Sequence, residues 1–95
     1  MTVLKSEIST HTDRFRDNRV AMLEAIGVAD AAALQAAEGG DAQARERHVS
    51  RGKMLPRDRV MGLIDPATPF LEIGTTAAHG LYGGDAPGAG LVAGI

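Results

Sequence analysis

The chain has 95 residues, a net charge of −2 and no cysteine. One small domain is the most that this length allows, and its core is limited because short chains bury a smaller fraction of their surface. The composition excludes a disulfide scaffold, a thiolate nucleophile and a generally basic nucleic-acid binder. The opening residues lack a continuous apolar segment, so we expect neither a signal peptide nor a membrane span. We therefore expect a cytoplasmic protein.

The first predicted element is a helix over residues 8–26. Its apolar stripe has the spacing i, i+7, i+8 and i+11 and consists of Phe15, Met22, Leu23 and Ile26. Its candidate N-caps are Ser9, Thr10 and Thr12. Gly27 is expected to weaken or end this helix. A second, alanine-rich helix over residues 30–38 is expected to end at Gly39 and Gly40.

Two further helices are predicted in the middle of the chain. The third runs over residues 41–51, with Asp41 as N-cap and Gly52 just beyond its end. The fourth begins at Pro56, which suits the first helical position because that position needs no N–H donor. Its apolar face consists of Val60, Leu63 and Ile64. The pair Asp65-Pro66 is expected to stop it.

The pattern changes after Pro66, where glycine and short apolar runs replace the helical periodicity. Residues 69–73 and 91–95 are predicted as strands, and the glycine-rich residues 77–90 as a long turn or loop. The sequence therefore predicts a helical arm over residues 1–65 and the beginning of a β layer over residues 66–95, an α/β organisation. Because the last predicted strand is apolar and has no polar flank, we expect a piece of a longer protein.

The bases gather in the middle of this acidic chain: Arg45, Arg47, Arg51, Lys53, Arg57 and Arg59, with His48 among them. Arginine forks beside a helix N-terminus can bind an anion, such as the phosphates of a nucleotide or of coenzyme A. The alternative is a solvated helix face, or pairing with Asp41, Glu46 and Asp58. Single-stranded nucleic acid is disfavoured because aromatic stacking platforms are absent from this zone.

Other motifs have simple structural explanations. Residues 88–94 resemble a relaxed dinucleotide fingerprint, but they follow a loop and precede a strand, so turns and close backbone packing explain these glycines better. The three histidines, His11, His48 and His79, lack the spacing of metal ligands. His79 could line a pocket with Tyr82 or be an ordinary loop residue. Ser50 has no evident base partner.

The segments ARERHVSRGKMLPRDRVMGLIDPATPFLEIG and HGLYGGDAPGAGLVAGI, with Asn18 and Met22 before them, resemble the N-terminal part of biotin-dependent acyl-CoA carboxyltransferases. The RGK…PR.R…DP..PFLE core is common to that family, and HGLYGGDAPGAG is more similar to its methylcrotonyl-CoA carboxylase β-subunit branch. Met54 and Ile64 stand where leucine is usual, and residues 28–38 match loosely. These swaps conserve volume and leave the resemblance intact.

The resemblance implies a crotonase-like ββα superhelix in the parent protein. This mostly helical chain would supply an N-terminal arm and the first strands of the carboxyltransferase N-domain. The family transfers a carboxyl group from carboxybiotin, carried on a partner α subunit, to an acyl-CoA such as 3-methylcrotonyl-CoA, a reaction of leucine degradation. It further implies a homo-oligomer, a trimer of dimers. The catalytic groups would lie beyond Ile95, so we expect the 95-residue chain alone to be inactive, with no metal, nucleic-acid or membrane partner.

The residues that the resemblance places beside coenzyme A are Arg51, Lys53, Arg57, His79 and Tyr82. Three alternatives remain. The arm could be a purely structural element at a subunit interface, the acyl group could be geranyl or propionyl, or the chain could be an independent helical adaptor.

Overall fold

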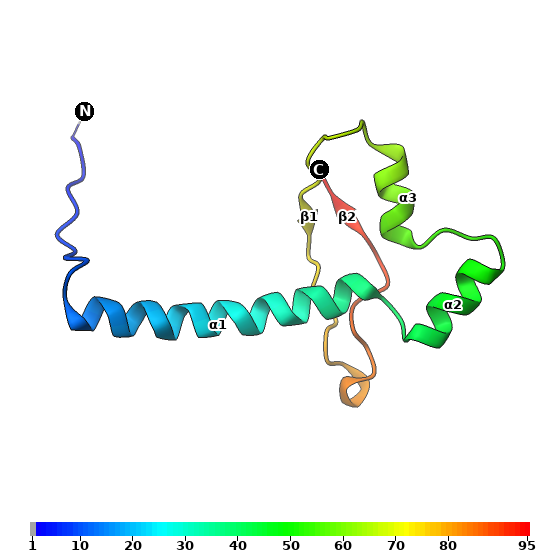
Figure 1. The fold of residues 1–95 in the computed structure, drawn as a ribbon, viewed down its shortest axis with the longest axis horizontal. Coiled ribbons are helices and arrows are strands. Elements are labelled where there is room, and N and C mark those ends of the chain that lie inside the picture. Colours follow the sequence, from blue (N-terminus) through cyan, green and yellow to red (C-terminus); the bar gives the residue numbers. More distant parts are fainter. Residues whose placement is uncertain (1) are drawn as a thin grey trace.

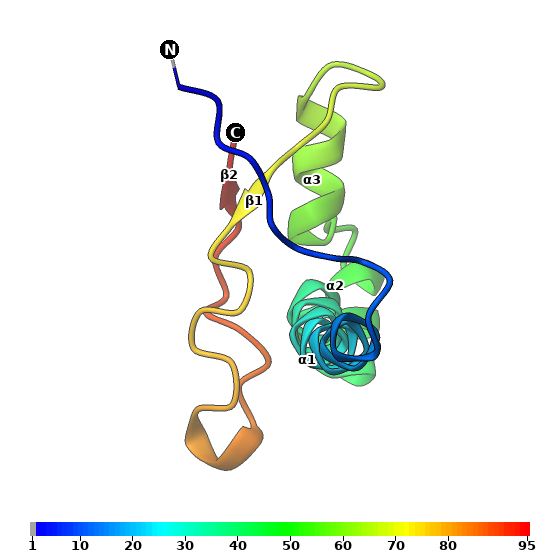
Figure 2. The ribbon, with the colours of Figure 1, turned by 90° about the vertical axis from the view of Figure 1, so that its left-hand side faces the viewer.

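The computed structural model describes residues 2–95 as three α-helices and a two-stranded ribbon whose strands are joined by a long turn (Figure 1). The first helix, α1, extends far from the other elements, which gather around its C-terminal end. The molecule is accordingly elongated, with dimensions of 58 × 37 × 19 Å. Figure 2, which looks along α1, shows β1 and β2 beside α3, with the turn between the strands extending past α1.

Helix α1 (Asp13–Glu38) is a single continuous helix. The prediction of two helices over residues 8–26 and 30–38 is therefore wrong, and residues 8–12 are not helical. Gly27 costs a helix only about 1 kcal/mol relative to alanine, and the alanines around it favour helix, so the helix continues through it. The cap predictions are confirmed: Thr12 Oγ1 accepts from the Phe15 amide at 3.2 Å, and Gly39 ends the helix at φ 80°.

Helices α2 (Ala42–Ser50) and α3 (Pro56–Leu63) begin and end close to where the sequence predicts. The Asp41 carboxylate accepts from the Ala44 amide at 2.6 Å, and Gly52 follows α2 at φ 76°. Pro56 occupies the first turn of α3, where its missing N–H leaves no intrahelical bond unmade. The helix ends at Leu63, shortly before Asp65-Pro66.

Replacing Asp41 with alanine should destabilise α2 by about 1 kcal/mol, because the Ala44 amide loses its acceptor. Amide hydrogen exchange at Ala44 measures the effect and should be faster in Asp41→Ala. The matched control is Asp41→Asn, which keeps a side-chain oxygen and should retain most of the protection. Equal exchange in both variants and the original chain would show that the cap contributes nothing.

Strands β1 (Glu72–Ile73) and β2 (Ala93–Gly94) pair antiparallel, with Glu72 opposite Gly94. Both predicted strands are in the right place but shorter than expected. The ribbon continues one residue further, since Leu71 and Ile95 exchange two backbone hydrogen bonds of 2.7 and 3.0 Å. The predicted turn between the strands is confirmed and includes a short 3₁₀ segment, η1 (Tyr82–Gly84).

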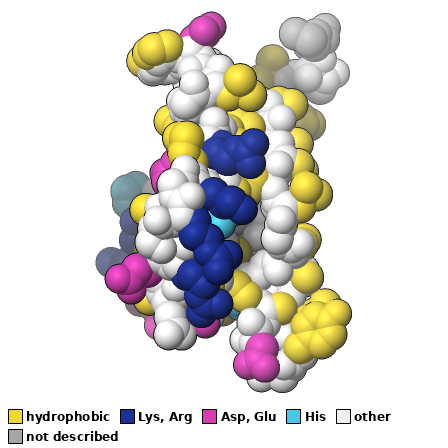
Figure 3. Space-filling view, turned by 90° about the vertical axis from the view of Figure 1, so that its right-hand side faces the viewer, with side chains coloured by type: hydrophobic (Ala, Val, Ile, Leu, Met, Phe, Trp, Pro, Cys, Tyr) yellow, Lys and Arg dark blue, Asp and Glu magenta, His cyan; other side chains and the backbone are white. Residues whose placement is uncertain are grey.

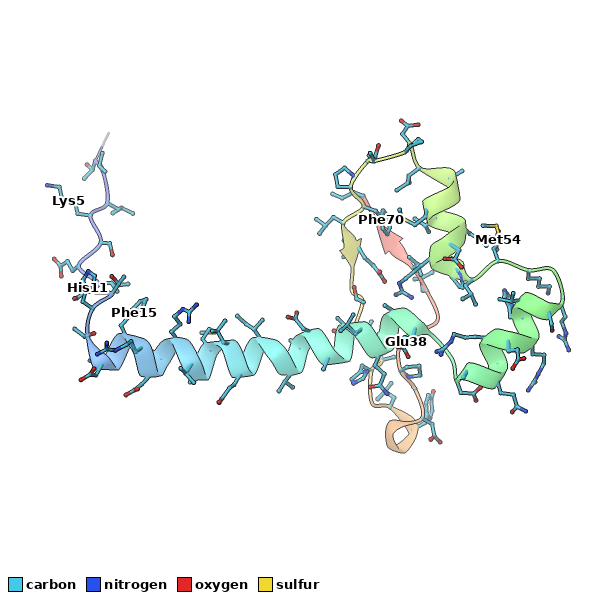
Figure 4. All side chains as sticks on the ribbon, viewed as in Figure 1. Lys5, His11, Phe15, Glu38, Met54 and Phe70 are labelled. Atoms are coloured by element: carbon cyan, nitrogen blue, oxygen red, sulfur yellow. The ribbon has the colours of Figure 1, made fainter. Side chains whose placement is uncertain are left out.

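The described residues contain almost no core. Ala36, near the end of α1, is the single buried residue of residues 2–95, with 5% of its surface exposed. The predicted apolar stripe of α1 is largely exposed, and Figure 4 shows the side chains along this part of the helix, including the labelled Phe15, clear of the other elements. The stripe thus has no partner within the described chain.

By length and composition alone, one helical stretch of the described residues, Asp13–Ser50, is long and apolar enough to cross a membrane. This finding differs from the expectation that the chain holds no such span. Alanine supplies much of this apolar character, and the acidic residues Glu24 and Asp30 interrupt it. A single helix of this kind is a weak indication, because packed helices of soluble proteins have the same length and composition.

Candidate functional site

The candidate site is an open groove of about 670 Å³ at the C-terminal end of α1. Its walls are the last turn of α1, parts of α2 and α3, and the extended residues 87–92. Most of the lining is apolar, and its basic side chains are Arg45, His48 and Arg57. Figure 3 shows this end of the molecule, where Lys and Arg side chains follow one another and a histidine lies between them.

Arg57, on the first turn of α3, is held from three sides. Its Nε donates to Glu72 Oε2 at 3.0 Å and its Nη2 to Glu72 Oε1 at 2.5 Å, which is a two-point pair. Its Nη1 donates to the Ala37 carbonyl at 3.0 Å and to the Ala36 carbonyl at 3.4 Å. Both charged side chains are largely covered, at 28% and 19% exposure. Such a pair is stronger and more directional than an exposed one.

Arg45, on α2, contacts the same end of α1. Its Nη1 donates to the Gly40 carbonyl at 2.8 Å and to the Glu38 carbonyl at 3.4 Å, and it lies 3.6 Å from Glu38 Oε2. Helix α1 has no basic residue in its own last turn. Arg45 and Arg57 therefore supply the positive charge that the negative end of the helix dipole favours.

His48 joins α2 to the segment that follows it. Its Nε2 lies 2.9 Å from the carbonyl oxygen of Met54, so one end of the link between α2 and α3 is fixed to α2. Arg45 and His48 stand three residues apart and so lie on one face of α2. This i, i+3 spacing was available in the sequence and indicates a shared face of α2, but not which elements that face meets.

The other four bases of the middle segment are exposed and form no ion pair within residues 2–95: Arg47, Arg51, Lys53 and Arg59. We call these four the basic column. The alternative pairing with Asp41, Glu46 and Asp58 is not observed for any base, since Arg45 and Arg57 use Glu38 and Glu72 instead. An exposed set of like charges raises the local concentration of anions.

The turn residues proposed from the sequence lie outside the groove lining. His79 Nδ1 is 2.9 Å from the Pro87 carbonyl, so this histidine closes the turn. Tyr82 is 84% exposed at φ 57°, a left-handed conformation that non-glycine residues seldom adopt. Of the five predicted coenzyme A contacts only Arg57 lines the groove. The structure thus does not bring the five together. Arg45 and His48, which the sequence placed in the basic run but not among the five, line the groove, and sequence reasoning missed the backbone of residues 87–92.

Within residues 2–95, no cluster of three or more metal-binding side chains is present. The groove offers guanidinium groups, one imidazole and backbone of an extended glycine-rich segment. Such groups bind and orient anionic or polar ligands; they do not form a nucleophile–base pair.

Comparison with known proteins places the chain in a family, although no family model matches it. It is 60% identical over 60 residues to the biotin-dependent 3-methylcrotonyl-coenzyme A carboxylase β1 subunit of Mycobacterium tuberculosis, a match that covers 63% of this chain and 11% of the relative. It is 37% identical over 94 residues to the probable mitochondrial methylcrotonoyl-CoA carboxylase β chain of Drosophila melanogaster, covering 98% of this chain and 16% of that protein.

A third relative is the probable biotin-dependent acyl-coenzyme A carboxylase β2 subunit of Mycobacterium tuberculosis, 32% identical over 93 residues and covering 98% of this chain and 17% of the relative. The chain thus spans less than a fifth of the length of these three relatives. Nearly all of its residues take part in the longer matches, which agrees with the motifs found in the sequence. The chain belongs to the family of methylcrotonyl-CoA carboxylase β subunits.

Proposed function

We propose that this chain is part of a carboxyltransferase subunit that moves a carboxyl group from carboxybiotin to a branched unsaturated acyl-CoA such as 3-methylcrotonyl-CoA. The observation that carries the proposal is the similarity of 93 or 94 of its residues to proteins named as methylcrotonoyl-CoA carboxylase β chains. Biotin would be carried by a partner α subunit, and other copies of the carboxyltransferase subunit would complete the assembly. The described residues would contribute binding and positioning.

Within this function, the basic column is the part of the chain best suited to the phosphates of acyl-CoA. Its side chains are exposed and make no ion pair with the described residues, so they are available to an anion. Arginine and lysine are the usual phosphate ligands of proteins. Arg51 and Lys53 keep the role proposed from the sequence. Arg57 does not, because each of its guanidinium nitrogens already donates to an oxygen of the chain.

Replacing Lys53 or Arg51 with alanine in the intact carboxylase should raise the KM for acyl-CoA and leave kcat nearly unchanged. These side chains would act far from the reacting atoms, so they would bind ground state and transition state equally. One charge-assisted contact is worth about 1.5–3 kcal/mol, which corresponds to a rise of roughly ten-fold or more. The measurement is steady-state kinetics at two salt concentrations, because salt screens charges and should reduce the difference in KM between the variants and the original protein.

The control for these variants is Lys5→Ala, which removes one base far from the column in the sequence. It should leave the KM unchanged. If the column variants keep the original KM but the assembly dissociates on gel filtration, the column is a subunit interface. An unchanged KM with an intact assembly would mean that the basic column is only a solvated helix face and binds no acyl-CoA.

A second candidate function is that of a structural arm. It is favoured by α1, whose apolar residues Val20, Met22, Leu23, Val28 and Leu34 are exposed along a helix that projects from the rest of the chain. Deleting residues 2–30 from the intact protein tests it. Dissociation of the assembly with an unchanged KM in any surviving complex would support the structural arm alone.

The acyl group also needs a direct test. The relative named only as an acyl-coenzyme A carboxylase is 32% identical to this chain, the same value as the Arabidopsis thaliana methylcrotonoyl-CoA carboxylase β chain. Identity at this level does not separate the substrates, although the relatives that are 60% and 37% identical are both named for methylcrotonyl-CoA. Comparing kcat/KM for 3-methylcrotonyl-CoA, geranyl-CoA and propionyl-CoA would decide among them.

A further inference from the structure

Arg57 connects elements that are distant in the sequence. It lies 15 residues before its carboxylate partner Glu72 and 20 and 21 residues after the two α1 carbonyls that it contacts. Its bonds therefore tie α3 to β1 and to the C-terminal end of α1. Nearby, Ala36 lies close against Gly88, where an added Cβ would come within 3.4 Å of the Ala36 Cβ. Arg57 holds the α3 wall of the groove against α1, and the contact of Ala36 with Gly88 holds the wall formed by residues 87–92.

The same anchor bears on the basic column. Arg51 and Lys53 lie in the irregular link between α2 and α3. One part of that link is fixed by the bond between His48 and the Met54 carbonyl. Met54 lies two residues before Pro56, and the chain passes from it directly into α3, whose first turn is held by Arg57. The position of the link therefore depends on both anchors.

We propose that Arg57 is a positioning residue that acts through Glu72 to hold the link and the basic column in a binding arrangement. The inference rests on the proposed function, since it concerns the surface offered to acyl-CoA. It assigns Arg57 no contact with the ligand. The adjacent Glu72 carboxylate opposes the approach of a phosphate, and the guanidinium Nε, Nη1 and Nη2 already donate to protein oxygens.

The test compares Arg57→Ala, Glu72→Ala and the double variant in the intact carboxylase. Each single change should raise the KM for acyl-CoA roughly ten-fold with little change in kcat, because displacement of a binding surface weakens ground state and transition state together. The double variant should be no worse than Arg57→Ala alone, since the Glu72 pair is already lost in that variant. If Arg57 were an anion ligand, removing an acidic neighbour would leave the KM unchanged or lower it.

Conservative and control variants separate this role from general destabilisation. Arg57→Lys keeps the charge but loses the two-point fork, so the KM should remain raised several-fold. The matched control is Arg16→Ala, which removes an exposed ion pair with Asp13 on α1 and should change neither constant. Full rescue by lysine would overturn the positioning role.

Hydrogen exchange distinguishes failure of the anchor from failure of the proposed function. In the intact protein Glu72→Gln, a milder change, should accelerate exchange in the last turn of α1 and in β1. Unchanged exchange there would overturn the anchor even if the enzyme uses acyl-CoA. Accelerated exchange in a protein that shows no acyl-CoA turnover would overturn the proposed function and the role assigned to the basic column. The pair of Arg57 and Glu72 would then have a structural role only.

Discussion

The isolated 95-residue chain is expected to be partly helical and to lose its helicity gradually on heating, without a cooperative transition. Only Ala36 is buried among the described residues, so little apolar surface leaves water on folding. Helices that lack tertiary packing are marginal in water, and α2 and α3 have only 9 and 8 residues. Far-UV circular dichroism against temperature measures this directly.

The same measurement on the intact parent subunit is the control. There the apolar side of α1 and the face formed by Val60 and Leu63 should gain partners, and the helical signal should disappear in one sharp step. A sharp two-state transition of the isolated chain, with dispersed amide signals from a monomer, would contradict the prediction. It would instead favour the independent helical adaptor that the sequence left open.

Local features of this fold could be predicted because they depend on neighbouring residues alone. The Asp41 cap bonds the amide three residues ahead, Pro56 has a missing donor, and Gly52 adopts a positive φ just after a helix end. Each of these features depends only on residues within about one helical turn of it. The prediction that a helix ends at Gly27 was wrong for an equally local reason. The destabilisation by one glycine is smaller than the stabilisation that the neighbouring alanines give the helix.

The site could not be predicted because it depends on contacts across long sequence separations. Nothing in the spacing of Arg57 and Glu72 indicates that the two side chains pair, and Glu72 reads simply as a strand residue. Likewise, the exposure of Arg51 and Lys53 follows from the absence of partners within the described chain, which no local pattern records. The sequence did locate the zone of bases, but only the fold separates Arg45 and Arg57, which are used internally, from the basic column.

The interpretation of residues 88–94 as glycines required for close packing is confirmed at Gly94. A Cβ at this position would lie less than 3.0 Å from the Leu71 carbonyl oxygen and from the ring of Phe70. Figure 4 shows Phe70 beside the ribbon. Because Gly94 is also the residue opposite Glu72, a shift of β2 would displace the partner of Arg57 as well.

Gly94→Ala in the intact protein is therefore expected to break the ribbon and to destabilise the protein by about 3 kcal/mol, the upper end for a side chain forced into occupied space. Two measurements check it: the thermal midpoint, and hydrogen exchange at the Leu71 and Ile95 amides, whose mutual bonds would be lost first. The matched control is Gly27→Ala on α1, where a Cβ meets nothing within 4 Å of the described chain. That change should strengthen the helix by up to about 1 kcal/mol. Retained protection at Leu71 in Gly94→Ala would mean that the ribbon can open to accept a methyl group, and the close-packing explanation for this glycine would be wrong.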